Sequence, residues 1–365
     1  YSQIAYDTDK KNKHAKKPVN KLIKKIFRKF RLEISKYNPV ESQRAFVSLK
    51  PENQCIGSIL LSYIIDPFLL KPSEQISNAH HHDWLSWQIA QTFLNLGYAV
   101  DAIDYRDNKF IPQKKYAFFV GARTNFQRIA EVLSEDCLKI VHLDTAHWLF
   151  NNHASYKRSL DLQQRKGVTI SSKSQRIVES NLAIEYADYA TTNLGNQFNV
   201  STYRYAKKPI FQIYLPTYTF YSWTEAKDYE TCRNNFVWFG SSGLVHKGLD
   251  LALEAFAKMP DYHLYVCGPI DREKRFERIY YKELYQTSNI HNMGWVDIES
   301  TKFIEIMNDC IGTIFPTCSE GGGASVITCM QAGLIPVVSY ESNVEVDDFG
   351  FTLRDCSITN IINII

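Results

Sequence analysis

The segment that decides the fold is residues 315–325, FPTCSEGGGAS, followed directly by residues 326–338, VITCMQAGLIPVV. A short apolar run ends at Phe315, three glycines follow an acid, a helical pattern begins at Ala324, and a second apolar run begins at Ile335. Strand, turn, helix and strand in this order predict part of a parallel α/β sheet. Three consecutive glycines allow several backbone N–H groups to converge on an anion, and the N-terminus of the following helix adds positive potential.

A second turn rich in small residues lies upstream. Residues 239–250 read FGSSGLVHKGLD, so small residues follow a predicted strand and Lys247 stands at the start of a helix. Small residues let the backbone approach a phosphate, and a lysine adds positive charge there. The carboxylate of Glu320 would repel a phosphate, so we expect it to face sugar hydroxyls. A plain strand-turn-helix connection accounts for residues 239–250 equally well.

Apolar runs alternate with helical patterns on both sides of these turns. In the first half, strands are predicted at 56–65, 98–103, 116–120 and 138–143, with helices at 83–96 and 127–133. In the second half, strands are predicted at 236–239, 263–267, 290–293, 311–315 and 335–339, with helices at 248–259, 276–285, 300–308 and 324–332. Strands separated by helices imply parallel sheets with covered faces. We therefore predict an α/β chain with two tandem Rossmann-like domains and a cleft between them, where ligands of such sheets bind.

Length and composition agree with two soluble domains. The 365 residues are about twice the ~150 of an average domain, and 45% hydrophobic with 22% charged residues exclude disorder and collagen. No run reaches the ~18 apolar residues of a membrane span, so no transmembrane helix is expected. The eight cysteines include no CxxC pair, which argues against a disulfide framework or a zinc knuckle and indicates a reducing, cytoplasmic setting.

Positive charge is concentrated near the N-terminus. Residues 10–36 contain twelve Lys or Arg and one acid, whereas the rest of the chain is net acidic. Apolar side chains recur every three or four positions over residues 19–34, which predicts an amphipathic helix with basic flanks. We expect this helix to lie on the inner, anionic face of a membrane, where each lysine contributes ~1 kcal/mol. A linker helix that packs on the body, or the tail of a removed upstream domain, would give the same pattern. No nucleic acid partner is expected, because the body offers no basic surface.

The order of motifs in the second half resembles the C-terminal domain of the group 1 (family 4-like) glycosyltransferases, which have the GT-B fold. The resemblance covers about residues 235–339 and includes KGLD at 247–250, VCGP at 266–269, NMGWV at 292–296, FPTCSEG at 315–321 and GLIPVV at 333–338. Together with the basic arm over 1–50, which the charge distribution indicates, it implies an acceptor domain over 51–215 and a nucleotide-sugar domain over 216–365, which we expect to be truncated.

The resemblance also implies roles for particular residues. Lys247 matches a lysine that neutralises the donor diphosphate, and Glu320 matches the first acid of a Glu-x7-Glu motif, which contacts the donor sugar. The turn whose N–H groups hold the distal phosphate corresponds to Gly322, Gly323, Ala324 and Ser325. The segment beside the nucleobase corresponds to Gly294, Trp295 and Val296, and Ser241 is also placed on the donor side.

Two positions depart from the family pattern. The second acid of the motif falls at Thr328, which can offer one hydroxyl to a ribose. The arginine five residues before the lysine falls at Ser242, which cannot supply a positive charge. Each loss removes a charged contact worth about 1.5–3 kcal/mol. We keep both positions on the donor side and expect donor binding to be weaker, differently arranged or lost.

The N-terminal half is expected to supply a histidine and the acceptor contacts. Similar enzymes place a histidine that faces the donor sugar after the fourth strand, and residues 141–148 read VHLDTAHW. We take His147 as the catalytic histidine and His142 as the second choice, because His142 falls inside the predicted strand. Residues 80–84, HHHDW, replace the glycine-rich first turn of the family. The acceptor contacts are placed at His82, Asp83 and Trp84.

Together these features predict transfer of a sugar from a nucleotide diphosphate sugar to a carbohydrate or lipid-linked acceptor. The resemblance implies that the anomeric configuration is retained and that no cofactor is needed; adjacent histidines cannot readily converge on one metal ion, so no metal is expected. The alternative is a catalytically silent GT-B protein that binds a glycan or a partner at the membrane, which the losses at Ser242 and Thr328 favour. A nicotinamide oxidoreductase is disfavoured, because no GxGxxG motif follows either first strand.

Overall fold

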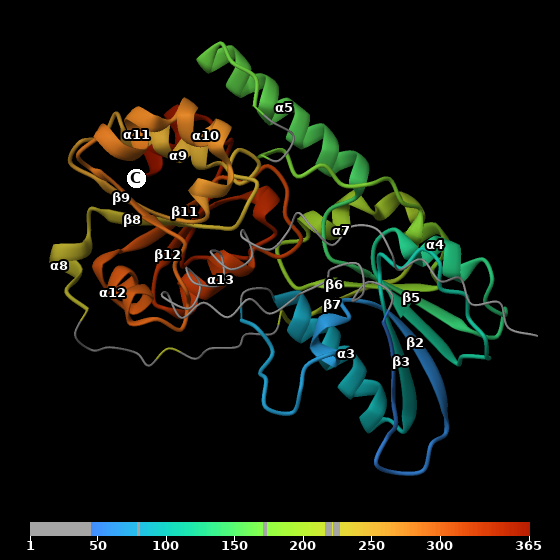
Figure 1. Cartoon of the computed structure of the whole chain (residues 1–365). Coiled ribbons are helices and arrows are strands. Elements are labelled where there is room, and N and C mark those ends of the chain that lie inside the picture. The colour runs from blue at the N-terminus through green and yellow to red at the C-terminus, as the bar shows by residue number, and fades with distance from the viewer. Residues whose placement is uncertain (1–44, 79–80, 171–173, 216–220, 222–226) are drawn as a thin grey trace, which may run out of the picture. The chain divides into compact units, whose positions relative to one another are not determined.

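The computed structural model describes residues 45–78, 81–170, 174–215, 221 and 227–365 (Figure 1). This described part contains two β-sheets, each flanked by helices. The predicted fold class, α/β with two tandem Rossmann-like sheets, is confirmed. The amphipathic helix predicted over 19–34 lies outside the described residues.

The first sheet has seven strands in the order β1-β3-β2-β4-β5-β6-β7. Neighbouring strands are parallel except for β1, which pairs antiparallel with β3. The strands are β1 (Phe46–Leu49), β2 (Gly57–Tyr63), β3 (Tyr98–Asp104), β4 (Phe118–Gly121), β5 (Leu138–Leu143), β6 (Tyr189–Asn193) and β7 (Ile210–Ile213). The α-helices of this half are α3 (His81–Asn95), α4 (Asn125–Ala130), α5 (Trp148–Lys166), α6 (Ala183–Tyr186) and α7 (Phe198–Thr202).

The second sheet has six strands in the order β10-β9-β8-β11-β12-β13, all parallel. The strands are β8 (Asn235–Phe239), β9 (His263–Cys267), β10 (Ile290–Gly294), β11 (Gly312–Phe315), β12 (Ile335–Ser339) and β13 (Phe351–Leu353). The α-helices are α8 (Tyr229–Cys232), α9 (Leu249–Phe256), α10 (Lys274–Ile279), α11 (Tyr281–Gln286), α12 (Thr301–Asp309), α13 (Ala324–Gln331) and α14 (Ile358–Ile364).

Continuous apolar runs form the central strands because both faces of each sheet are covered. In β2, Ile59 and Leu61 point to one face and belong to a core cluster that includes Leu85 of α3. Leu60 points to the other face and belongs to a cluster that includes Phe126 of α4. All three strand residues are fully buried. Helices α3 and α4 therefore cover opposite faces of the first sheet.

Most predicted elements appear within a few residues of their expected bounds. The helix predicted over 276–285 is an exception, because the structure has two helices there, α10 and α11, which meet at Tyr280. The Tyr280 ring is fully buried, its backbone leaves the helical conformation, and its hydroxyl donates to Glu254 over 2.6 Å. Elements without a counterpart among the predicted ones include β1, β7, β13, α5, α14 and the short helices α6, α7 and α8.

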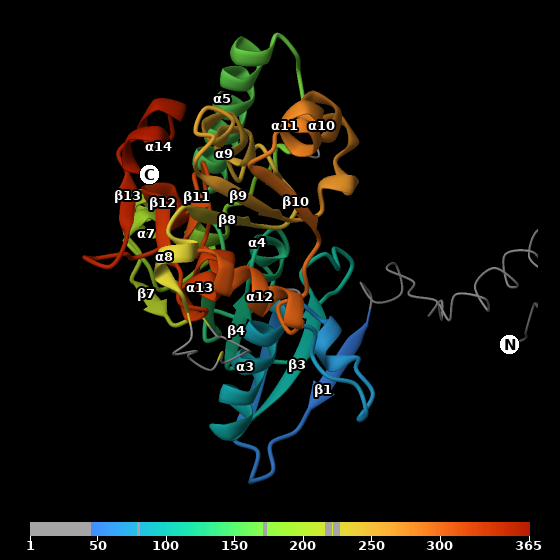
Figure 2. The same ribbon diagram turned by 90° about the vertical axis from the view of Figure 1, so that its left-hand side faces the viewer.

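Helix α5 extends from the first sheet to the helices beside the second sheet (Figures 1 and 2). Leu162, near the end of α5, lies in the hydrophobic core of the second domain. Arg165 pairs with Asp250 of α9 over 2.5 Å, and Lys166 pairs with Glu283 of α11 over 2.8 Å. Basic helix residues ordinarily face solvent, whereas Arg165 and Lys166 join the two domains.

Candidate active site

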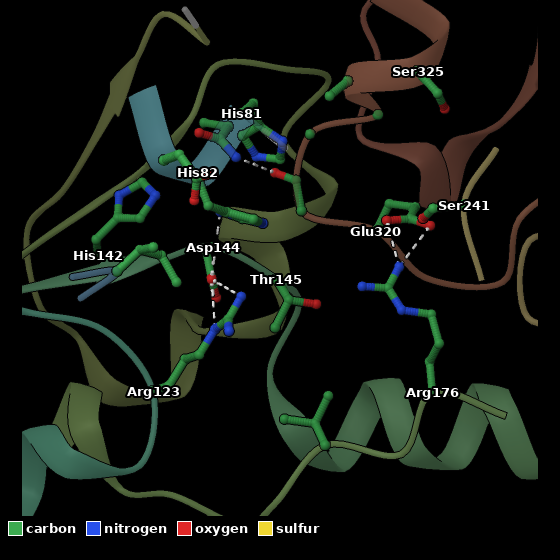
Figure 3. A pocket seen from close by; sticks show the side chains of 18 of the residues that line it. His81, His82, Arg123, His142, Asp144, Thr145, Arg176, Ser241, Glu320 and Ser325 are labelled. Carbon is green, nitrogen blue, oxygen red and sulfur yellow. Dashed lines mark hydrogen bonds and ion pairs between the residues drawn. The ribbon is translucent and has the colours of Figure 1, made fainter. Parts of the chain in front are cut away.

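A cleft of about 1460 Å³ lies at the carboxyl ends of the strands of both sheets. From the first sheet it is lined by Arg123, which follows β4, and by Asp144, which follows β5. From the second sheet it is lined by Ser241, which follows β8, and by Glu320, which follows β11 (Figure 3). This is where α/β sheets bind ligands. Both domains therefore contribute side chains to one site.

A buried ion pair lies on the C-terminal side of the cleft. The ammonium of Lys247 donates to the carboxylate of Glu320 and lies 5.3 Å from the centre of the Phe315 ring. Burial opposes ionisation of Glu320, but the positive charges of Lys247 and Arg176 outweigh it and lower the pKa of Glu320 to about 2. Burial also lowers the pKa of Lys247, which the negative charge of Glu320 opposes. We infer that the pair is ionised at neutral pH.

A second cation, Arg176, reaches the same carboxylate. It lies in the segment between α5 and α6, and its Nη1 is 3.3 Å from both oxygens of Glu320 (Figure 3). This arginine comes from the N-terminal half of the chain, whereas Lys247 and Glu320 come from the C-terminal half. The three side chains therefore form a charge cluster across the cleft.

The glycine turn before α13 brings the two domains into close contact. A Cβ on Gly321 would lie 2.0 Å from the backbone oxygen of Asp144, and one on Gly322 would lie 2.9 Å from the Cβ of Asn193. Gly323 has a positive φ of 55° and caps α13. The turn opens onto the cleft at the helix N-terminus, as predicted, but at Gly321 and Gly322 the close approach of the first domain also requires glycine.

On the opposite side of the cleft, Asp144 is the centre of a buried polar cluster. Arg123 donates to its Oδ2 over 2.8 Å and 2.7 Å, and the hydroxyl of Tyr63 lies 3.4 Å from the same atom. Burial opposes ionisation of Asp144, but Arg123 outweighs it, so the pKa of Asp144 lies well below its usual range. Nδ1 of His82 is 2.5 Å from the Tyr63 hydroxyl and 3.8 Å from Asp144. Figure 3 shows His82, Asp144 and Arg123 on this side of the cleft.

Two neighbouring groups in this half have shifted pKa values for the same reason. Burial lowers the pKa of the His142 imidazole to about 4, and its Nδ1 lies 3.0 Å from Oγ1 of Thr191. Burial raises the pKa of the Asp83 carboxyl to about 6, and the negative charge of Asp66 adds to this. The His142 imidazole is therefore neutral at neutral pH. The Asp83 carboxyl, with a pKa of about 6, titrates just below neutral pH.

Twelve of the predicted site residues line the cleft. They are His82, Asp83, Ser241, Lys247, Trp295, Val296, Glu320, Gly322, Gly323, Ala324, Ser325 and Thr328. The second-choice histidine, His142, lines it as well. The hydroxyl of Thr328 donates to the backbone oxygen of Ala324 over 2.9 Å, within its own helix. Residues predicted for the donor side and for the acceptor side thus line the same cleft. The role of each residue stays a prediction.

Four predicted residues are not among those that line the cleft. His147 caps the N-terminus of α5, and its Nε2 lies 3.2 Å from the Tyr205 hydroxyl, so its ring is placed by the α5 terminus. Ser242 is exposed, and Gly294 ends β10 with a φ of 69° and open space around it. The indole of Trp84 donates to Asn78 over 3.2 Å. Of the two histidines considered in this region, His142 lines the cleft and His147 does not, while the catalytic role of either stays a prediction.

Several site residues were not singled out as site residues from the sequence. Arg123, Asp144 and Tyr63 follow or end strands at the carboxyl edge of the first sheet, so their position at strand ends was the available signal. From the sequence, Arg176 is expected to be solvated or to suit an anionic lipid-linked acceptor; its contact with Glu320 is not predictable locally, because it joins residues 144 positions apart.

The described residues contain neither a cluster of metal ligands nor a membrane-spanning helix. Among them, no group of three or more His, Cys, Asp or Glu side chains is placed to hold a metal ion. None of the helices in this part of the chain has the length and hydropathy needed to cross a membrane.

One family model matches part of the chain. Residues 230–346 match the family model described as "Glycosyl transferases group 1". This match contains Lys247, Glu320 and the glycine turn. No curated protein matches the chain in sequence.

Solved structures share the fold at low sequence identity. Sucrose-phosphate synthase from Thermosynechococcus elongatus is 13% identical, with a TM-score of 0.53 over 85% of this chain and 88% of the other. HepE from Anabaena, in complex with UDP-glucose, is 12% identical, with a TM-score of 0.50 over 84% of this chain and 88% of the other. Both alignments extend across most of the chain, so both sheets take part in the shared fold.

Proposed function

We propose that this chain is a group 1 glycosyltransferase, and that it transfers a sugar from a nucleotide diphosphate sugar to a hydroxyl of a carbohydrate or lipid-linked acceptor. The observation that carries the proposal is that Lys247, Glu320 and the N-terminus of α13 open onto one cleft that the first domain also lines. The buried ammonium and the helix N-terminus suit the diphosphate, and the carboxylate suits sugar hydroxyls.

In this reaction the bond between the anomeric carbon and the phosphate oxygen breaks, and the acceptor oxygen forms a bond with that carbon. The acceptor proton passes to the departing diphosphate, and the anomeric configuration is retained. Negative charge collects on the diphosphate in the transition state, where Lys247 stabilises it. Glu320, released from Lys247 when the diphosphate binds, then accepts hydrogen bonds from the donor sugar.

The acceptor binds on the side formed by the first domain. His82 and Asp83 line this side, next to the buried cluster of Asp144 and Arg123. The imidazole of His142, neutral at neutral pH, faces the donor sugar in place of His147. The HepE structure holds UDP-glucose, which makes UDP and its sugars the first donors to test.

The test is calorimetric titration of UDP, GDP and their sugars against the wild-type chain and Lys247→Ala. At least one nucleotide is expected to bind, and Lys247→Ala is expected to weaken its affinity at least tenfold. Lys274→Ala is the matched control, because Lys274 pairs with a glutamate, Glu277, over 2.9 Å but is exposed and outside the cleft lining. No binding of any of these nucleotides at millimolar concentration would sink the proposal.

The second candidate function is a silent member of the family that uses the cleft to bind a glycan or a partner. It is favoured by two observations: Thr328 stands where the family has an acid, and its hydroxyl bonds to its own helix. The same titration separates the two candidates. A chain that binds a glycan but no nucleotide would support the silent function.

A further inference from the structure

Arg176 is held in place by contacts on the N-terminal side of the cleft. Its φ of 48° lies in the left-handed region, which costs a residue with a side chain about 1 kcal/mol or more. Asn151 of α5 donates to the Arg176 backbone oxygen over 3.0 Å, and Ser155 of α5 donates to the backbone oxygen of Gln175. Asn152 donates to the backbone oxygen of Val178 over 2.9 Å and accepts from its N–H over 2.9 Å. Three side chains of α5 thus fix the backbone on both sides of Arg176.

The C-terminal domain leaves room for the stem of this arginine. Gly243 has a φ of 91°, and a Cβ there would lie 2.5 Å from both Cγ and Cδ of Arg176. The Gly243 N–H donates to the buried carboxylate of Glu273 over 2.5 Å, which fixes the turn. A side chain at position 243 would therefore push Arg176 aside. The turn at Gly243 and helix α5 together direct the Arg176 guanidinium toward the cleft.

The charges at this point are not balanced. One carboxylate, Glu320, faces two cations, Lys247 and Arg176. The Arg176 side chain is 45% exposed, whereas that of Lys247 is 7% exposed, so a ligand in the cleft can reach the guanidinium directly. Two cations around one carboxylate leave an excess positive charge, which favours a bound anion. A guanidinium also matches phosphate oxygens in a bidentate geometry.

We propose that Arg176 binds the donor diphosphate together with Lys247. It supplies, from the N-terminal half of the chain, the positive charge that Ser242 cannot supply from the C-terminal half. This inference rests on the proposed function, because it concerns the diphosphate of the same donor. It makes donor binding depend on both domains: one phosphate-binding cation is fixed to α5, and the other belongs to the turn before α9.

The first experiment uses Arg176→Gln in the full chain, with UDP and uridine as probes in calorimetry. UDP affinity is expected to fall at least tenfold, whereas affinity for uridine, which has no phosphate, is expected to stay within twofold. Arg176→Lys is expected to retain more UDP affinity than Arg176→Gln, because it keeps the charge but loses the bidentate geometry. Arg275→Gln is the matched control, because Arg275 donates to the backbone of Thr169, in the same connection after α5, but is exposed and outside the cleft lining.

The outcomes separate this inference from the proposed function. If Lys247→Ala weakens UDP binding and Arg176→Gln leaves it within twofold, the role of Arg176 is overturned while the proposed function stands. Equal losses of UDP and uridine affinity in Arg176→Gln would also overturn it, since they indicate a structural effect.

A second measurement needs no variant that must fold. Arginine modification of the wild-type chain with phenylglyoxal, followed by mass spectrometry, is expected to label Arg176, and saturating UDP is expected to protect it. Uridine is expected to give no protection. Unchanged labelling of Arg176 at saturating UDP would overturn the inference.

Discussion

At the scale of single residues, the site depends on charges that are buried together. Lys247 and Glu320 are both largely removed from water, where an isolated charge is strongly disfavoured. Their mutual attraction, with Arg176 as a further partner, keeps the carboxylate ionised. Removing one partner of such a pair typically costs 3–5 kcal/mol, because the other charge is left uncompensated. The ligand site is therefore also a determinant of stability.

The first prediction concerns the pH dependence of stability through Glu320. Its pKa is about 2 in the folded chain and near 4.5 when unfolded, so the unfolded state binds more protons between these values. The carboxylate therefore contributes stability that is present above pH 4.5 and is lost as the pH falls toward 2, roughly 3 kcal/mol in all. The Glu320→Gln variant lacks this contribution. The difference in free energy of unfolding between the wild type and Glu320→Gln is therefore expected to shrink as the pH falls from 4.5 toward 2.

Urea unfolding at a series of pH values between 2.5 and 7 measures this difference. Glu305→Gln, at an exposed position of α12, is the control and is expected to follow the wild type. A difference between wild type and Glu320→Gln that stays constant from pH 7 to pH 2.5 would contradict the ionised pair.

At the scale of elements, helix α5 joins the two domains through its own side chains. Part of its polar surface is buried against the second domain. Arg158 is buried and donates to the backbone oxygen of Pro316 over 3.0 Å. Pro316 directly follows β11, so this bond fixes α5 to the segment that leads to Glu320. A helix rich in charged residues thereby supports the position of the segment between β11 and α13.

The second prediction tests this contact. Arg158→Ala removes a buried hydrogen bond and the packing of a long side chain, so the free energy of unfolding is expected to fall by about 3 kcal/mol. The neighbouring substitution Lys157→Ala, at an exposed position of the same helix, is expected to change it by less than about 0.5 kcal/mol. Chemical denaturation measures the free energy of unfolding of both variants. Equal losses in the two variants would show that the hydrogen bond from Arg158 to Pro316 does not contribute measurably to stability.

Elements that form the core of a sheet are predictable from sequence, and elements that join domains are much less so. Strand β2 contains three consecutive fully buried apolar residues, Ile59, Leu60 and Leu61, which a covered strand or a buried helix explains. Helix α5 is mostly polar, and its buried face is completed by the other domain, so its sequence lacks a clear apolar stripe. β1 and β7 are short edge strands with half-exposed side chains, which weakens their pattern.

The same reason explains which part of the site was predictable. Lys247, Glu320 and the glycine turn belong to local motifs that one segment of sequence contains. The contact between Arg176 and Glu320 arises only when α5 and its following segment fold back against the second domain. His147 was chosen because it follows a strand, but it is close enough to the start of α5 to cap that helix instead.

At the scale of the whole molecule, the chain combines an acidic body with a basic N-terminal arm. A cationic amphipathic segment binds anionic lipid through both its charges and its apolar residues. A lipid-linked acceptor would then be presented at the same surface. This arrangement links the proposed membrane contact to the proposed substrate.

The third prediction follows from this charge distribution. The full chain is expected to float with vesicles that contain phosphatidylglycerol, and a variant that lacks residues 1–36 is expected to remain in the dense fraction. High salt is expected to reduce flotation of the full chain, because screening weakens attraction between lysines and lipid phosphates. Equal flotation of the two chains would reject attachment through the arm, and vesicles of neutral lipid serve as the control.

Helix α5 begins in the first domain and ends in ion pairs with α9 and α11 of the second, so it links the two domains over a fixed length. Its 19 residues span about 28 Å at 1.5 Å each. Moving the two domains apart would require bending α5 or breaking the ion pairs made by Arg165 and Lys166. The distance between the two domains is therefore expected to change only when those ion pairs break. Inserting one helical turn into α5 would lengthen it by about 5.4 Å and shift the two domains relative to each other by that amount.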